Sequence, residues 1–297
     1  MRIIKEVFED SCEICNVTKK GKCVIANVDG EYLVLKKKSN HNIRETYNYL
    51  SSRNFNYFPI IRRENQDYNV YEYIEDADIS IDQKAFDMMH LLSLLHNKTT
   101  FYKEMDIIEY KEIFEDLTDK INTTYNFYSN LITVIESHIF MSPSEYLIAR
   151  NISKIFGALE YSKRNLDEWY NIIKNTAKKR VVLLYNNVDI NHILRNKDIY
   201  LINWEKSKLG IPIYDLYNFY LKYSFNFDFI DLLDFYESRY PLLKEEKLLL
   251  YIMISIPEIM YFNDSEINNC KKAKNIIDFI YKTEVLISKD EEKKETV

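Results

Sequence analysis

Short runs of hydrophobic and β-branched residues, separated by polar turns, occupy roughly the first quarter of the chain. Between the first two runs, Asp29-Gly30 favours the tight turn of a β-hairpin. Further along, Ile43, Tyr47 and Leu50 recur at helical spacing, which predicts a helix over residues 43–52. The chain is therefore expected to begin with a small sheet and one helix. The predicted strands cover residues 22–26, 32–36, 58–62 and 68–74.

From about residue 80 onward, hydrophobic residues recur every three or four positions, as in helices that bury one face. Ser142-Pro143-Ser144-Glu145 has the composition of a helix start, with a capping serine followed by an acid. The charged residues 289–297 predict a disordered tail. The predicted helices cover residues 85–96, 107–135 as one or two helices, 145–159, 165–177, and several between 214 and 287.

The helical pattern is interrupted between residues 181 and 205. Residues 181–184 predict a short apolar strand, and a polar loop and two further short strands follow it. A sheet, a set of helices, a β-rich loop segment and more helices indicate an α+β fold with two lobes. We expect a small antiparallel-sheet N-terminal lobe over residues 1–77 and a larger, mostly helical C-terminal lobe over residues 78–288.

Composition excludes several functional classes. With 4 glycines, no two of them closely spaced, the chain cannot form the glycine-rich phosphate loops of Rossmann or P-loop proteins. The net charge of −6 disfavours nucleic acid as a partner, and no apolar run is long enough to cross a membrane. The N-terminus lacks an apolar signal region, so we expect a cytoplasmic protein. Cys12 and Cys15 form a C-x-x-C without a redox or zinc context, and we interpret them as ordinary thiols.

Five segments then carry a pattern of chemistry. Lys36 ends a hydrophobic run, Glu45 lies in the helix that follows, and Glu72-Tyr73 lies in a later strand. Two loop segments complete the pattern, and they read Tyr185-Asn186-Asn187-Val188-Asp189-Ile190-Asn191-His192-Ile193-Leu194 and Leu201-Ile202-Asn203-Trp204-Glu205. In this order the segments resemble the protein-kinase-like fold in its aminoglycoside and choline phosphotransferase branch. Within that branch the chain looks most like the CotS-like spore coat proteins.

The resemblance implies roles for the N-terminal residues. Lys36 stands where the family has the lysine that holds the nucleotide phosphates, and Glu45 matches the acid that pairs with this lysine. Lys37 and Lys38 compete for that position, but strand alternation favours Lys36. Glu72 and Tyr73 match the hinge strand, whose backbone would meet an adenine. ATP is therefore the candidate cofactor.

The two loop segments depart from the family pattern at the residues that carry its chemistry. The family loop reads H-G-D-x-x-x-x-N-I-L, so Asn187 replaces the catalytic Asp and His192 replaces the metal-binding Asn. Asn203 replaces the Asp that binds Mg²⁺, and Glu205 is the nearest remaining carboxylate. An amide cannot accept a proton, and Mg²⁺ prefers carboxylates, so both catalysis and metal binding are expected to be weak. A shift in register to Asp189 fails, because its metal partner would be Leu194.

These replacements favour a pseudokinase, a kinase-like protein that acts through binding or assembly and is not an enzyme. Two alternatives stay open. One is an active small-molecule phosphotransferase with a site rearranged around Glu205 and Asp189. The other is a sensor that binds ATP without turnover. The resemblance implies other spore coat proteins as partners and a place in the spore coat after synthesis in the cytoplasm.

Overall fold

The computed structural model describes residues 7–8 and 14–295, so Cys12 of the predicted thiol pair lies outside the described residues. The chain divides into two compact units. The first contains Met1–Thr99 and Leu183–Leu209, and the second contains Thr100–Val182 and Gly210–Val297. The lobe boundaries predicted from the sequence, after residues 77 and 288, stay a prediction. The predicted fold class is confirmed: an antiparallel sheet dominates the N-terminal region and helices dominate the C-terminal part.

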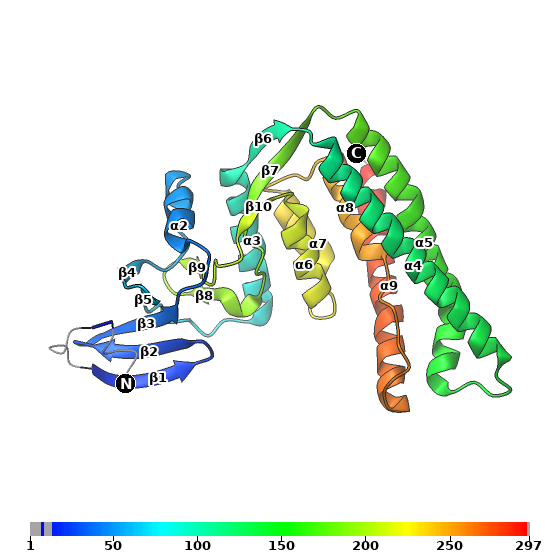
Figure 1. Cartoon of the computed structure of the whole chain (residues 1–297), viewed down its shortest axis with the longest axis horizontal. Helices are drawn as coiled ribbons and strands as arrows, with labels where there is room; N and C mark the ends of the chain where they lie inside the picture. Colours follow the sequence, from blue (N-terminus) through cyan, green and yellow to red (C-terminus); the bar gives the residue numbers. More distant parts are fainter. Residues whose placement is uncertain (1–6, 9–13, 296–297) are drawn as a thin grey trace. The chain divides into compact units, whose positions relative to one another are not determined.

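The first unit is built on an antiparallel sheet with the strand order β1-β2-β3-β5-β4 (Figure 1). The β2–β3 hairpin turns at Asp29 and Gly30, both with positive φ, as the sequence predicts. One face of the sheet buries Leu33, Leu35 and Val70 in a small hydrophobic core. The strands are β1 (Ile14–Lys20), β2 (Cys23–Val28), β3 (Glu31–Lys37), β4 (Ile61–Glu64) and β5 (Tyr68–Glu72).

Two helices accompany this sheet within the first unit. Helix α2 (Ile43–Ser52) has the bounds that the sequence predicts, and the Asn42 side chain caps it by accepting from the Glu45 amide. Helix α3 (Ile81–Thr99) is buried along most of its length. Strands β8 (Ile193–Arg195) and β9 (Ile199–Leu201) form a hairpin next to it, after the short 3₁₀ helix η1 (Ile190–His192). This hairpin and the residues around it carry most of the candidate site.

Asparagine takes several of the backbone positions that usually require glycine. A positive φ is found at Asn54, Asn186 and Asn203, and asparagine tolerates this left-handed conformation better than most residues. A chain with 4 glycines can therefore still make the sharp turns of its loops.

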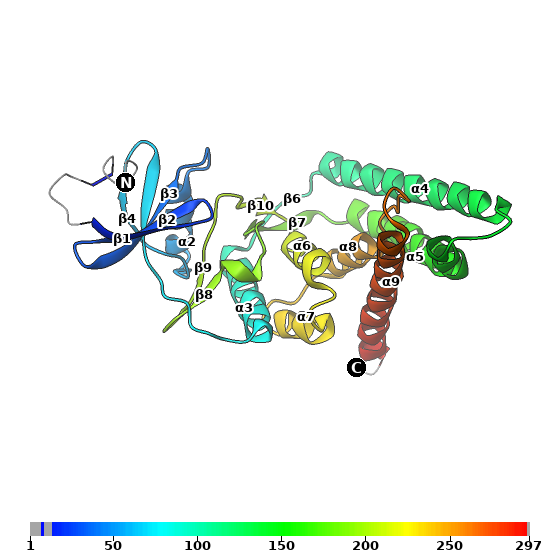
Figure 2. The ribbon, with the colours of Figure 1, turned by 90° about the horizontal axis from the view of Figure 1, so that it is seen from below.

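The second unit is a set of long helices. Helices α4 (Ile107–Ser137) and α5 (Pro143–Lys174) run side by side as a hairpin, which is visible in Figures 1 and 2. Ser142 and Glu145 form the predicted helix start as a capping box. The two helices predicted over 145–159 and 165–177 are one continuous helix, because the residues between them contain no helix breaker. At the other end of this hairpin, β6 (Phe101–Glu104) pairs with β7 (Lys178–Leu184).

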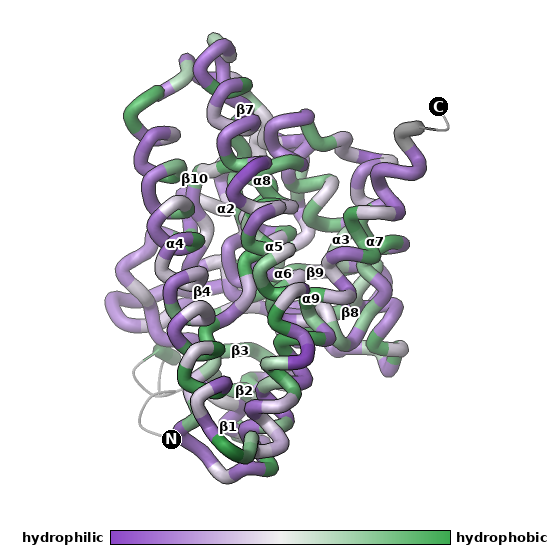
Figure 3. The backbone as a smooth tube through the Cα atoms, turned by 90° about the vertical axis from the view of Figure 1, so that its right-hand side faces the viewer, coloured by the Kyte–Doolittle hydropathy of each residue, from purple (hydrophilic) through white to green (hydrophobic). Residues whose placement is uncertain are grey.

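The remaining helices of the second unit pack on α5 directly or through a neighbour, since α6 contacts α8 and α7 contacts α9. Helices α8 and α9 both contact α5, and hydrophobic and hydrophilic residues alternate along these helices (Figure 3). Helix α9 continues through Glu295, so residues 289–295 are helical where the sequence predicts a disordered tail; residues 296–297 lie outside the described range. No described helix is long and apolar enough to cross a membrane. The elements are β10 (Lys208–Gly210), α6 (Ile213–Tyr223), α7 (Phe229–Glu237), α8 (Lys244–Ser255) and α9 (Glu266–Glu295).

Candidate functional site

The Lys36 side chain is the centre of a polar cluster within the first unit. Its amino group donates a hydrogen bond of 2.5 Å to Oδ1 of Asn203 and forms an ion pair with the carboxylate of Glu205. The side chains of Lys36 and Glu205 are only 18% and 20% exposed. Because they are partly removed from water, their attraction is stronger than that of a surface pair.

Asn203 is held in this position by its neighbours. Its backbone has a φ of 65°, which a β-branched residue would not tolerate. The following residue, Trp204, is fully buried, and its indole N–H donates to the carbonyl of Leu201 at 2.8 Å. The buried Trp204 thus fixes the backbone between Asn203 and Glu205. Both of these side chains contact Lys36.

Asn187 and His192 join the same cluster through hydrogen bonds. The Asn187 side-chain amide donates to the carbonyl of Asn203 at 2.9 Å. His192 Nδ1 lies 2.9 Å from the carbonyl of Asn187, and the backbone of His192 accepts from Ile202 at 3.0 Å. The structure therefore brings Lys36, Asn187, His192 and Asn203 together, four residues that the sequence analysis selected from separate segments.

Glu45 is not the partner of Lys36, and that prediction is wrong. Glu45 lies in the first turn of α2 on its exposed side, where its carboxylate accepts from the Asn42 side chain at 2.7 Å. Helix α2 turns Ile43, Tyr47 and Leu50 inward, and a residue two positions after Ile43 points away from them. Glu205 pairs with Lys36 instead, although the sequence suggested Glu205 only as a metal ligand and as part of a rearranged active site.

Asp189, the predicted substitute base, shapes the loop. Its carboxylate accepts from the backbone and side-chain amides of Asn191 at 2.8 and 2.9 Å, which caps the 3₁₀ helix η1. Such a cap fixes the turn that carries His192.

Glu72 and Tyr73, the predicted hinge residues, lie at the end of β5 and contact the neighbouring segments of the sheet. The Glu72 carboxylate accepts from the Ile60 amide at 3.1 Å and pairs with Arg62 at 3.3 Å. The Tyr73 amide donates to the carbonyl of Tyr32 at 3.3 Å, and the two tyrosine rings are 5.7 Å apart.

His41 is a member of the cluster that the sequence analysis missed. Its Nε2 lies 2.8 Å from the Thr46 hydroxyl and 3.2 Å from the Ser207 hydroxyl. This contact connects the start of α2 to the segment that carries Glu205. A lone histidine without ligand spacing gave no signal of this role in the sequence.

Comparison with known proteins supports one fold. No protein-family model matches the sequence, and none of the curated proteins matches it either. Among solved structures, an aminoglycoside phosphotransferase from Alicyclobacillus acidocaldarius is similar, with a TM-score of 0.71 and 10% identity, over 96% of this chain and 93% of that one. An AMP-bound spectinomycin phosphotransferase has a TM-score of 0.53 and 13% identity, over 94% and 96%. LicA, a choline kinase from Streptococcus pneumoniae, has in its AMP complex a TM-score of 0.50 and 18% identity, over 94% and 98%.

The chain has a kinase-like fold. It is the fold of the aminoglycoside phosphotransferase and choline kinase branch. At these identities the likeness concerns the fold alone.

A kinase-like fold implies Mg²⁺, and the residues of this cluster do not fit it. Mg²⁺ is usually held by one or two carboxylates together with phosphates. Glu205 offers the carboxylate here, but Lys36 already neutralises it, and Oδ1 of Asn203 accepts from the same lysine. Within the described residues, no group of three histidine, cysteine or acidic side chains is arranged to hold a metal.

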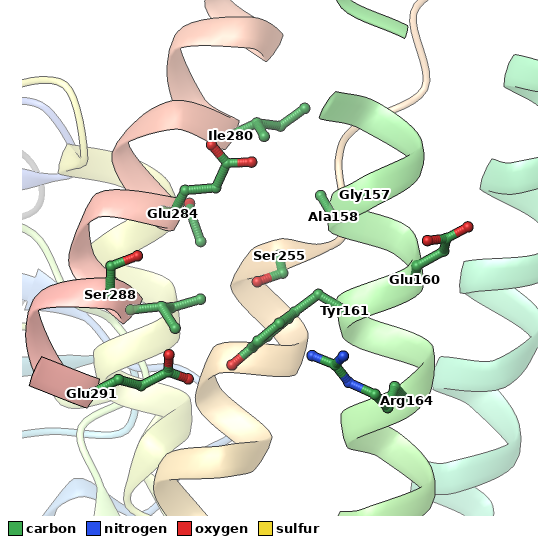
Figure 4. Close-up of a pocket in the computed structure, with 12 residues that line it drawn as sticks. Gly157, Ala158, Glu160, Tyr161, Arg164, Ser255, Ile280, Glu284, Ser288 and Glu291 are labelled. Atoms are coloured by element: carbon green, nitrogen blue, oxygen red, sulfur yellow. The ribbon is translucent and has the colours of Figure 1, made fainter. Parts of the chain in front are cut away.

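A separate pocket of about 540 Å³ lies in the second unit of this kinase-like chain, between α5, α8 and α9 (Figure 4). Tyr161 reaches from α5 toward α9, where Glu284 and Glu291 line the opposite side. Burial, together with the nearby charge of Glu291, raises the pKa of the Tyr161 phenol to about 12. None of the residues predicted as a site from the sequence lines this pocket.

Proposed function

We propose that this kinase-like protein is catalytically impaired and acts through binding or assembly. The observation that carries the proposal is the hydrogen bond from the Asn187 amide to the carbonyl of Asn203. Asn187 stands where the resemblance places the catalytic base of the family. Its amide donates a hydrogen bond there, whereas phosphoryl transfer needs a group that accepts a proton.

The chemistry of the cluster supports the same conclusion. Losing a general base lowers a reaction rate by about 10²–10⁴. Lys36, which would hold nucleotide phosphates, is neutralised by Glu205. Phosphoryl transfer depends on positive charge around the transferred group, so a neutralised lysine in a cluster that does not fit Mg²⁺ leaves little to stabilise it.

The test combines ATP binding with turnover on the full chain. ATP is titrated with and without Mg²⁺ while the unfolding temperature is followed, and phosphate release is measured in the same samples. The expected result is no phosphate release above a buffer blank. Mg²⁺-dependent release that Glu205→Gln abolishes, and that the exposed control Glu31→Gln retains, would contradict the proposal. That result would favour the phosphotransferase rearranged around Glu205 and Asp189.

Exposed hydrophobic side chains favour a role in protein assembly. Ile139 and Phe140, in the turn between α4 and α5, are 91% and 88% exposed. Large side chains that remain this exposed often mark contacts with other proteins. Ile139→Ser with Phe140→Ser should reduce concentration-dependent association in sedimentation experiments, with Ile267→Ser as a matched exposed control.

The resemblance to CotS-like proteins further suggests that the partners are spore coat proteins. A fluorescent fusion in the source organism, followed through sporulation, tests this suggestion. We expect signal in the cytoplasm first and on the spore surface later. Signal that stays evenly distributed in mature spores would contradict a coat location.

A further inference from the structure

The pocket between α5, α8 and α9 has charged side chains at two separate ends (Figure 4). At one end, Arg164 of α5 and Glu291 of α9 flank the Tyr161 side chain. Burial is the largest cause of the raised pKa of Tyr161, and the charges of Glu291 and Arg164 shift it in opposite directions, so both charges lie near the phenol. At the other end, Glu284 of α9 lies across from Gly157 of α5.

The protein itself compensates these charges weakly. Within the described residues, neither Arg164 nor Glu291 forms an ion pair. Glu284 pairs with Lys154 at 3.8 Å, and these two side chains are 48% and 44% exposed. Such a long and exposed ion pair contributes little to stability. A ligand can therefore meet one positive and two negative groups in this pocket without breaking a strong ion pair.

An apolar surface connects the two charged ends. Ile280 and Ile287 line the pocket from α9, Ala158 lines it from α5, and all three are buried. An aliphatic chain can lie on this surface, where the burial of its methylene groups is favourable. The pocket therefore suits a ligand with polar groups at both ends and a hydrocarbon chain between them.

Gly157 keeps the pocket open beside Glu284. Glycine is a poor helix former, yet this glycine, one of 4 in the chain, lies inside the 32-residue helix α5. Packing does not require it, because an added Cβ would meet no atom within 4 Å, and its φ is not positive. We therefore attribute this glycine to the space that it leaves in the pocket.

The order of the charges matches a basic amino acid. Its α-carboxylate and α-ammonium groups are neighbours, as Arg164 and Glu291 are, and a guanidinium group binds a carboxylate well. Its side-chain cation lies at the end of an aliphatic chain, as Glu284 lies two helical turns, roughly 10 Å, from Glu291. An extended lysine or arginine side chain and two flexible glutamate side chains can together bridge this distance.

We propose that this pocket binds a free basic amino acid, lysine or arginine. Arg164 holds the α-carboxylate, Glu291 the α-ammonium group, and Glu284 the side-chain cation. A linear diamine offers no anion to Arg164, and an amino acid with an apolar side chain offers no cation to Glu284. The site goes beyond the proposed function and does not depend on it, because neither Lys36 nor any residue that contacts it lines the pocket.

Calorimetric titration of the full chain tests which groups of the ligand are recognised. Lysine and arginine should both bind with saturation at millimolar concentrations. Cadaverine lacks the carboxylate, norleucine lacks the side-chain ammonium group, and Nα-acetyl-lysine lacks the α-ammonium group. Each of these three compounds should bind about tenfold more weakly than lysine, the effect of losing one charge-assisted hydrogen bond.

Variants of the charged side chains test which residues recognise these groups. Arg164→Gln and Glu284→Gln should each lower the affinity for lysine about tenfold. Glu284→Gln should leave norleucine binding unchanged, which a general loss of structure would not do. Glu160→Gln is the matched control, because Glu160 also lines the pocket but points away from it (Figure 4), and it should change the affinity less than about twofold.

Variants of Gly157 separate binding from folding. Gly157→Ala should raise the unfolding temperature, because alanine is the better helix former. Gly157→Leu should also keep the fold, since nothing lies within 4 Å of the added Cβ, but its side chain fills the pocket. Lysine should raise the unfolding temperature of the unmodified chain and of Glu160→Gln, and it should not raise that of Gly157→Leu.

Four results would overturn the proposal. Without saturation at millimolar lysine there is no site for a free amino acid. Equal affinities for lysine and cadaverine would identify an acidic surface that attracts any amine. Tighter binding of Nα-acetyl-lysine than of lysine would identify the C-terminus of a peptide as the ligand. An unchanged affinity for lysine in Gly157→Leu would place the bound amino acid outside this pocket.

Discussion

The carboxylate of Glu205 pairs with the amino group of Lys36 across 169 residues of sequence, and the two side chains are 20% and 18% exposed. In the kinase-like branch that this chain resembles, the helix after the lysine strand would supply the acid. Here that acid, Glu45, faces outward in the cap of α2. The loop containing Asn203 thus supplies both groups that contact Lys36. These contacts connect β3 to the loop, and Glu205 neutralises the charge of Lys36.

Glu205→Gln should lower stability and raise affinity for anions. The substitution leaves a partly buried lysine charge without its carboxylate, which should reduce the free energy of unfolding by about 1–2 kcal/mol. The same free charge should strengthen the binding of inorganic phosphate. Urea denaturation and calorimetric titration measure the two effects, with Glu31→Gln as an exposed control on β3. Equal stability of the two variants would show that the pair contributes little.

A second prediction concerns the buried ion pair between Arg180 and Glu246 in the second unit. The side chains are 8% and 5% exposed, and Arg180 also donates to the carbonyl of Pro241 at 3.0 Å. Glu246→Gln should cost about 3 kcal/mol, because it leaves a buried guanidinium without its counter-charge. Glu168→Gln, which breaks the exposed pair with Lys244, should cost less than about 1 kcal/mol. Chemical denaturation compares the two, and similar losses would contradict the argument from burial.

The sequence predicted local elements well where one face of an element is buried. Ile43, Tyr47 and Leu50 are buried on one side of α2, and the predicted helix has the observed bounds. Strand β1 was not predicted, because all its residues after Ile14 are exposed and no hydrophobic alternation marks it. The missed continuity of α5 has a similar cause, since a polar stretch without a breaker does not end a helix.

It was harder to predict which residues of the candidate site contact one another than which residues belong to it. Lys36, Asn187, His192 and Asn203 could be selected from the resemblance to the kinase-like family, and the structure brings them together. The partner of Lys36 depends on two tertiary features, the outward face of α2 and the left-handed backbone at Asn203. Neither leaves a periodic signal in the sequence, so Glu45 was chosen over Glu205.

Alkaline pH should destabilise the protein through its buried tyrosines. Burial raises the pKa of Tyr220 to about 12, and that of Tyr71 to about 12. Between pH 10 and 12 the unfolded chain loses phenol protons that the folded chain keeps, so the stability present below pH 10 is lost as pH rises. Tyr220→Phe should make this decline shallower, whereas Tyr146→Phe, at a position 53% exposed, should not. Denaturation between pH 8 and pH 11 measures the slopes, and identical slopes for Tyr220→Phe and the unmodified chain would contradict the prediction.

Aspartate at position 203 should cost little stability, whereas aspartate at position 187 should cost more. Oδ1 of Asn203 accepts from the Lys36 ammonium, and a carboxylate oxygen accepts there equally well, so Asn203→Asp should change stability by less than about 1 kcal/mol. The Asn187 amide instead donates to the carbonyl of Asn203. Asn187→Asp replaces that donor with an acceptor that faces another acceptor, which should cost about 1–3 kcal/mol. Urea denaturation of both variants at pH 7 decides the matter. A larger loss for Asn203→Asp than for Asn187→Asp would contradict the argument from these two hydrogen bonds.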